Sequence, residues 1–122
     1  MKKPTIPTSA TATFDLFINT LDPWETELLR QTTLNVDPYS VCLALTPGFL
    51  AVSDGSVSRK HHGLFGWVVS SLDGERLAVG MGPVRGRRPQ SFRAEAYGLL
   101  SLLRFLIRIK EFTGMHDAWV EC

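Results

Sequence analysis

The chain has 122 residues, of which 44% are hydrophobic and 20% are charged, and its formal net charge is +1. These values are those of an ordinary folded domain and exclude a disordered, low-complexity chain. Because the net charge is so small, any affinity for nucleic acid has to come from local clusters of Lys and Arg rather than from the total charge.

The N-terminal stretch Met1–Thr13 is rich in Lys, Pro, Thr, Ser and Ala, and we expect a disordered leader there. No stretch of the chain has the apolar length of a signal peptide or a membrane span. The cysteines Cys42 and Cys122 lie in apolar surroundings without metal-ligand spacing, which favours reduced core thiols. The sequence thus predicts a cytoplasmic or nuclear protein that is not secreted and does not contact a membrane.

Residues 14–47 predict a helical connector that precedes the main domain. Two helical pieces are expected, Phe14–Ile18 and Pro23–Gln31. The second has a clear start, with Asp22 as the N-cap and proline at the first helical position. After a loop, the apolar run Val41–Leu45 predicts a short strand.

The main domain is expected at residues 48–122 and begins with strands. The Asp-Gly pair in Leu72–Glu75, between two apolar runs, is typical of a tight hairpin. The first strand leads into Asp54 and is expected to break at Gly55. The three predicted strands are Phe49–Ser53, Gly63–Ser71 and Arg76–Gly82.

A long helix is predicted from Phe92 to about Lys110, with Ser91 as its N-cap and Thr113-Gly114 as its end. Ala118–Cys122 then predicts a fourth strand. Arg104, Arg108 and Lys110 are expected to face water, and the predicted buried face carries Leu99, Leu100, Leu103, Leu106 and Ile107.

The predicted order is three antiparallel strands, a right-handed crossover helix and a fourth, parallel strand, which makes the fold class α/β. In this topology the end of the first strand and the start of the helix meet at one edge of the sheet. Asp54 and Glu95 therefore converge, and they are the candidate catalytic and metal-ligating residues. Two neighbouring acids in core elements are costly unless a cation lies between them, which points to a divalent metal ion. Loops at the same edge supply cations that could hold phosphates: Arg59, Lys60, Arg85, Arg87 and Arg88.

At this point the sequence resembles a known family, the ribonuclease H-like fold, and most closely the RNase H domains that follow reverse transcriptase in retroelement polyproteins. The resemblance covers about Phe49 to Cys122. It implies an endonuclease that hydrolyses the RNA strand of RNA–DNA hybrids, with Mg²⁺ or Mn²⁺ in a two-metal site of the complete domain, and a reverse-transcriptase polyprotein as the parent chain. Four motifs in order carry it: Ser53-Asp54-Gly55-Ser56, Gly63–Val69, Gly80-Met81-Gly82 and Ser91–Leu100.

The resemblance also assigns residues. Asp54 and Glu95 match the first two metal-binding acids of the family. The residues it implies for nucleic-acid binding are Gly55, Ser56, Lys60, Arg85, Arg87, Arg88 and Arg93.

The family has two further acids downstream, the third at the end of the fourth strand, just past Cys122. Asp117 lies before that strand, more than about 10 Å from the active edge at 3.3 Å per residue, and is rejected as a replacement. We therefore expect an incomplete RNase H-like domain with an N-terminal helical extension, a fragment that is inactive or nearly so.

Several simpler interpretations remain open. Asp54 could be a turn residue before Gly55, Glu95 an ordinary first-turn acid favoured by the helix dipole, and the arginine loop merely solvated. The functional alternatives are a non-catalytic nucleic-acid-binding remnant of the fold, a structural or interaction domain, and a fragment of a transposase- or integrase-type nuclease.

Overall fold

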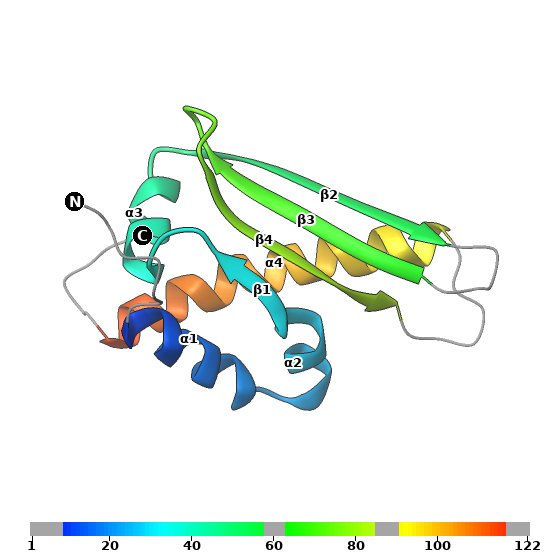
Figure 1. The fold of residues 1–122 in the computed structure, drawn as a ribbon, viewed down its shortest axis with the longest axis horizontal. Coiled ribbons are helices and arrows are strands. Elements are labelled where there is room, and N and C mark those ends of the chain that lie inside the picture. Colours follow the sequence, from blue (N-terminus) through cyan, green and yellow to red (C-terminus); the bar gives the residue numbers. More distant parts are fainter. Residues whose placement is uncertain (1–8, 58–62, 85–90, 117–122) are drawn as a thin grey trace.

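The computed structural model describes residues 9–57, 63–84 and 91–116 of the chain. Helix α1 begins inside the stretch expected to be a leader, so that expectation is wrong for Ser9–Thr13, and α4 runs past its predicted end at Thr113-Gly114. The elements in chain order are α1 (Ser9–Asn19), α2 (Pro23–Leu29), β1 (Gln31–Leu34), α3 (Pro38–Leu45), β2 (Phe49–Val57), β3 (Gly63–Ser71), β4 (Arg76–Val84) and α4 (Ser91–His116) (Figure 1).

The strands form an antiparallel sheet in the order β1-β4-β3-β2, which makes the fold α/β. The predicted three-stranded meander is confirmed as β2-β3-β4. Gly74 has φ +92° in the turn between β3 and β4, a conformation that glycine adopts readily. The fourth strand in the described part of the sheet is β1, which pairs with β4 and was not predicted. The predicted parallel strand Ala118–Cys122 lies outside the described residues.

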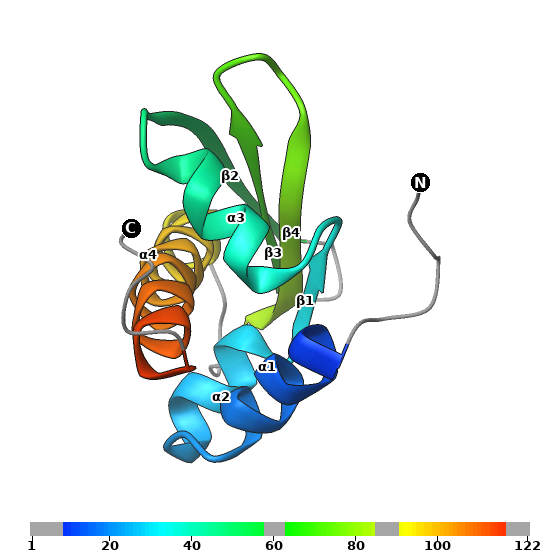
Figure 2. The ribbon, with the colours of Figure 1, turned by 90° about the vertical axis from the view of Figure 1, so that its left-hand side faces the viewer.

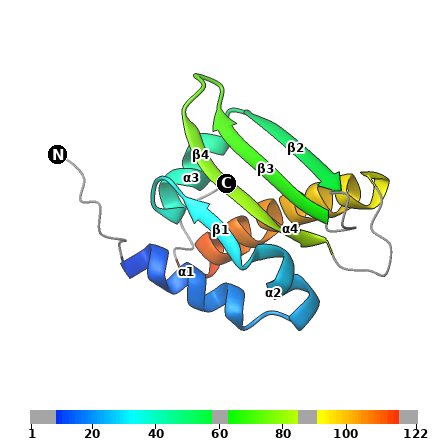
Figure 3. The same cartoon turned by 45° about the vertical axis from the view of Figure 1, so that its right-hand side comes forward.

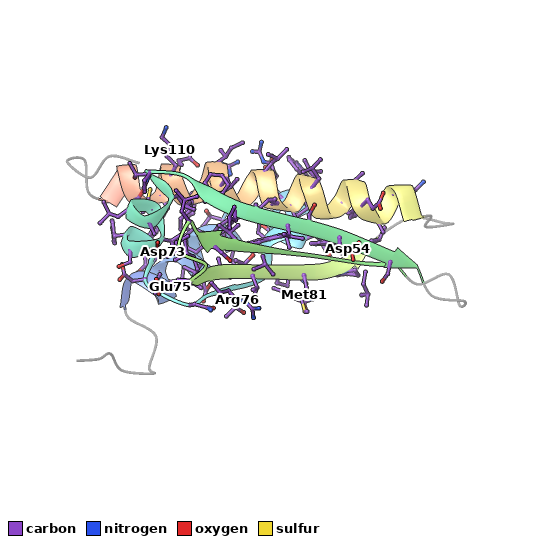
Figure 4. All side chains as sticks on the ribbon, turned by 90° about the horizontal axis from the view of Figure 1, so that it is seen from above. Asp54, Asp73, Glu75, Arg76, Met81 and Lys110 are labelled. Carbon is purple, nitrogen blue, oxygen red and sulfur yellow. The ribbon has the colours of Figure 1, made fainter. Side chains whose placement is uncertain are left out.

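The long helix α4 runs along one face of the sheet, over β2 and β3 (Figures 1 and 2). Helix α2 packs on α4 and β4, and α1 lies beside it next to β1 (Figure 3). Over the described residues no helix covers the opposite face of the sheet around Met81, which points away from α4 (Figure 4). The sheet therefore has one covered and one open face.

One hydrophobic core joins the N-terminal helices to the sheet and to α4. Phe14 of α1 is 1% exposed, and its ring centroid lies 5.2 Å from that of Phe112 near the end of α4. Trp67 of β3 lies 4.8 Å from Phe105 of α4, again between ring centroids. Residues 14–47 therefore contribute a strand and core side chains to the same folded unit as the main sheet.

The stretch Val41–Leu45 is helical, so the strand predicted there is wrong. Helix α3 begins at Pro38, and the carboxylate of Asp37 accepts a hydrogen bond from the backbone amide of Ser40 at 3.0 Å. An N-cap acid followed by proline is the same start signal that predicted the helix Pro23–Gln31. That prediction is confirmed for Pro23–Leu29, whereas Gln31 begins β1. The apolar composition of α3 reflects burial on α4 rather than strand formation.

The face of α4 that packs on the sheet is not the predicted one. It carries Phe105 and Ile109, which are buried, and the small residues Ala94 and Gly98, which let the helix approach closely. Most positions of α4 from Leu99 to Ile107 are apolar, so its leucine pattern fits more than one face. The close approach of the α4 backbone to β2 decides which face packs on the sheet. About half of the side chain is exposed at four of the five residues predicted to be buried: Leu99, Leu100, Leu103 and Ile107.

Cys42 in α3 is buried, and the hydroxyl of Thr113 donates a hydrogen bond to its sulfur at 3.4 Å. This sulfur is disulfide-bonded, so the prediction of a reduced thiol is wrong for Cys42. Apolar surroundings suit a thiol and a disulfide equally, which is why the sequence pattern did not separate them. Cys122 lies outside the described residues.

Candidate metal site

The backbones of β2 and α4 touch where the two candidate acids lie. A Cβ atom added to Gly55 would stand 2.3 Å from the carbonyl carbon of Ala94, and one added to Gly98 would stand 3.0 Å from the carbonyl oxygen of Asp54. Gly55 was expected to break the strand, but β2 continues through it to Val57. Glycine is needed here because any side chain would push the helix off the strand.

This contact brings the candidate acids to one junction. Asp54 precedes Gly55 in β2, and Glu95 follows Ala94 in α4, so each acid adjoins one member of the contacting pair. The topological prediction that the strand segment and the helix start meet is confirmed at the level of the backbone. Both side chains are exposed, so their oxygen atoms are open to solvent.

The Asp54 side chain leaves β2 on the face away from α4, and its carboxylate turns toward the open edge of the strand. Gly55 faces α4, and because successive side chains of a strand alternate, the Asp54 side chain leaves on the other side. One of its carboxylate oxygens accepts a hydrogen bond from the Gly55 amide at 2.8 Å. An amide bonded in this way is turned away from the neighbouring strand β3, and it carries the carboxylate toward the edge where, among the described residues, β2 has no partner.

Glu95 faces the same edge from α4. It lies nine residues before Arg104, about two and a half turns of an α-helix, and therefore on the opposite side of the helix. Arg104 is directed toward α2, because its Nε donates to Glu25 at 2.7 Å. Since α2 packs against α4 and β4, on the far side of the sheet from β2, Glu95 is left on the β2 side.

A cation shared by Asp54 and Glu95 would therefore lie at the open edge of β2. The layer between sheet and helix is closed to it, because the Gly55–Ala94 contact leaves no room there. Two exposed carboxylates form an oxygen-only donor set of the kind that Mg²⁺ and Mn²⁺ prefer, with water completing the coordination. Within residues 9–57, 63–84 and 91–116 no group of three or more His, Cys, Asp or Glu side chains is placed to hold a metal ion.

The other predicted site residues divide into four sets. Ser56 is exposed and shares the strand face of Asp54, two residues further along β2. Arg93 is exposed and lies about 200° around α4 from Glu95. Gly55 serves the packing of α4. The basic residues whose positions fall outside the described residues are Arg59, Lys60, Arg85, Arg87 and Arg88.

A second charged cluster was missed by the sequence analysis. Glu25 of α2 is 1% exposed, and it accepts hydrogen bonds from Arg104 and Arg108 of α4 at 2.6 to 2.7 Å. The two arginines had been expected to face water. The i, i+4 spacing of these arginines was a usable signal, because it places two guanidinium groups on one side of a helix.

These surrounding charges set the ionisation of Glu25. Hydrogen bonds from Arg108, and secondarily from Arg104, hold the pKa of Glu25 below its ordinary value, although burial acts in the opposite direction. The same contact with Glu25 raises the pKa of Arg108. Glu25, Arg104 and Arg108 therefore form a charged cluster that links α2 to α4, on the opposite side of α4 from Glu95.

A comparison of the chain with protein-family models, curated proteins and solved structures finds no match. Among the described helices none combines the length and the hydropathy that crossing a bilayer requires.

Proposed function

We propose that this chain carries the first two metal-binding acids of an RNase H-type nuclease, whose substrate is the RNA strand of an RNA–DNA hybrid. The observation that supports the proposal is the Gly55–Ala94 backbone contact, because it puts Asp54 and Glu95 at one junction from positions about forty residues apart. The antiparallel meander followed by a long helix is compatible with this class of fold.

In this proposal Asp54 and Glu95 hold a divalent cation at the open edge of β2. Bound there, the cation would supply an activated water and stabilise the leaving oxygen of a phosphodiester. Ser56, on the same strand face as Asp54, is placed to donate a hydrogen bond to a neighbouring phosphate. Two carboxylates alone bind Mg²⁺ weakly, so we expect hydrolysis by this chain to be slow or absent.

Metal binding tests the proposal without depending on turnover. Mn²⁺ titration, followed by paramagnetic broadening of backbone NMR signals, should broaden residues around Asp54 and Glu95 first. Asp54→Asn and Glu95→Gln should each weaken binding about ten-fold or more, because each removes one of two charged ligands. The matched control is Glu75→Gln, an exposed acid beside the hairpin at the far end of the sheet, which should leave binding unchanged.

Two results would count against the metal site. The first is broadening centred on residues away from Asp54 and Glu95. The second is an Mn²⁺ affinity that neither Asp54→Asn nor Glu95→Gln changes. Either result would show that these two acids do not bind the cation. Hydrolysis of an RNA–DNA hybrid in Mg²⁺ is the companion assay. Rapid cleavage lost in Asp54→Asn would confirm the reaction but contradict the expectation of a nearly inactive chain.

A non-catalytic nucleic-acid-binding remnant is the second candidate function. It is favoured by the fact that, within the described part of the chain, the acids at this junction are Asp54 and Glu95, both of them exposed. This alternative predicts hybrid binding that needs no Mg²⁺, falls steeply with salt and is unchanged in Glu95→Gln. The nuclease proposal predicts instead that Mg²⁺ strengthens binding and that Glu95→Gln abolishes this increase.

A further inference from the structure

The face of the sheet that points away from α4 is apolar, and none of the described helices covers it. Cβ atoms added to Gly80 and Gly82 would meet the rings of Trp67 and Phe65, so these glycines belong to the covered face. By strand alternation their neighbours belong to the opposite face. We call that surface the outer sheet face, and its residues on the three long strands are Leu50, Val52, Asp54, Ser56, Leu64, Gly66, Val68, Ser70, Arg76, Val79, Met81 and Pro83.

Large apolar side chains on the outer sheet face are unusually exposed. The exposed fractions are 54% for Leu50, 67% for Val52, 60% for Leu64 and 58% for Met81. They surround Val68, which lies at the centre, paired with Val52 on one side and Val79 on the other. A contiguous apolar patch of this kind on a folded protein marks a surface that packs against something else.

The size of the outer sheet face suits a modest protein interface. Three strands of nine residues, about 4.8 Å apart and rising about 3.3 Å per residue, together with the short β1, cover roughly 450 Å² in projection. Accessible area exceeds projected area, so two such faces together approach the roughly 1,200 Å² at the lower end of stable interfaces.

The charges at the corners of the outer sheet face are self-complementary. Arg76, opposite Ser70, lies on β4 at one corner, and Asp54, opposite Gly66, lies on β2 at the diagonal corner, with Val68 between them. Figure 4 shows Arg76 and Met81 projecting from this face. Consider a two-fold axis that lies in the plane of the face and is perpendicular to the Arg76–Asp54 diagonal. Rotation about this axis places Arg76 of a second copy opposite Asp54 of the first, and Asp54 of the second copy opposite Arg76 of the first.

We propose that the outer sheet face binds a second copy of this chain about that axis. Val68 of one copy then packs on Val68 of the other, and Arg76 pairs with Asp54 of the second copy at both corners. The strands of the two sheets cross at a steep angle, as in orthogonal sheet packing. Glu95, on the α4 side of the molecule, stays outside this interface, whereas Asp54 takes part in it, so the Arg76–Asp54 pair and a cation held by Asp54 and Glu95 would compete for the same carboxylate.

The test is the molar mass of the full chain in solution, measured by sedimentation velocity without divalent cations, so that the result does not depend on the proposed nuclease function. Between about 1 and 100 µM, a range suited to an interface of this size, the mass should rise from 13.6 kDa toward twice that value. Val52→Lys should raise the dissociation constant about ten-fold or more, because it places a charge in the apolar patch.

Two sets of variants give controls. Leu99→Lys alters a side chain that is also half exposed, but on α4, and should leave the dimer intact. Arg76→Asp and Asp54→Arg should each weaken the dimer, and the double variant should restore it. Circular dichroism confirms that each variant is folded.

Three outcomes would overturn the proposal. The first is a monomer throughout the concentration range. The second is a dimer that Leu99→Lys dissociates and Val52→Lys does not. The third is a double charge variant that dimerises no more tightly than the two single variants, which would contradict the proposed two-fold arrangement.

Discussion

Arg108 holds Glu25 with two parallel hydrogen bonds, from its Nε and from one terminal nitrogen, each 2.6 Å long. The bonded carboxylate is almost completely buried, and Arg104 adds a third bond at 2.7 Å. This fork joins residues that are 83 positions apart in the sequence, one on α2 and one on α4. It therefore fixes the N-terminal helices to the long helix with a specific geometry that apolar packing alone does not provide.

Replacing Glu25 by Gln should lower the free energy of unfolding by about 3 kcal/mol, because two guanidinium groups would be left without their buried counter-charge. Glu111→Gln is the matched control. Its carboxylate also binds Arg108 at 2.6 Å but is 45% exposed, and a loss of about 0.5 kcal/mol is expected. Urea unfolding followed by circular dichroism measures both values, and equal losses would contradict the role assigned to burial.

Stability should depend on pH in the acid range through Glu25. Its pKa in the folded state lies below the ordinary value of 4.5, so the unfolded chain binds the proton more tightly. The stabilisation is therefore fully present above about pH 4.5 and is lost as the pH falls through the lower, folded-state pKa. Urea midpoints between about pH 3 and pH 6 should show this loss, and the slope should be shallower in Glu25→Gln.

Gly55→Ala should be strongly destabilising, by about 2 kcal/mol or more, because its Cβ would stand 2.3 Å from the backbone of Ala94. Gly114→Ala is a control of opposite sign. It lies inside α4 with no atom within 4 Å of an added Cβ, and alanine should stabilise the helix there by about 0.5 to 1 kcal/mol. Thermal unfolding of both variants checks the pair. A neutral Gly55→Ala would mean that β2 and α4 are less closely packed than described.

Ser101→Ala should cost about 2 kcal/mol despite the small change in volume. The Ser101 hydroxyl accepts a hydrogen bond from the Trp67 indole at 2.8 Å and donates one to the carbonyl of Leu28 at 2.7 Å. All three residues are buried, so alanine leaves a donor and an acceptor without partners. Chemical unfolding measures the loss. If Ser101→Ala were as stable as the parent chain, the hydrogen bonds that join the sheet, α2 and α4 through Ser101 would not contribute to stability.

The strands β2, β3 and β4 could be predicted because local signals agree there. The Asp73-Gly74 pair demands a tight turn, and Gly74 adopts the positive φ that such a turn needs. Strand β1 could not be found in the same way. Gln31–Leu34 is short and mostly polar, and it forms a strand by pairing with β4, about 44 to 50 residues later in the sequence.

The candidate site was predicted in outline and not in detail. The order of strands and helix was enough to bring the segments carrying Asp54 and Glu95 together. The direction of each carboxylate depends on strand alternation at Gly55 and on which side of α4 faces the sheet. The second of these was predicted incorrectly, because the leucines of α4 suggest a face that the small residues Ala94 and Gly98 override.

The contact between Phe14 and Phe112 has a consequence for biosynthesis. These rings come from opposite ends of the chain, and the core that they close also holds the sheet between them in sequence. A nascent chain emerging from the ribosome can pair β2, β3 and β4 early, and α1 can contact α2 and α3, but Phe14 meets Phe105 and Phe112 only after α4 has been translated. Until then, this part of the aromatic core is incomplete, and the apolar surface of α1 that packs on α4 stays exposed.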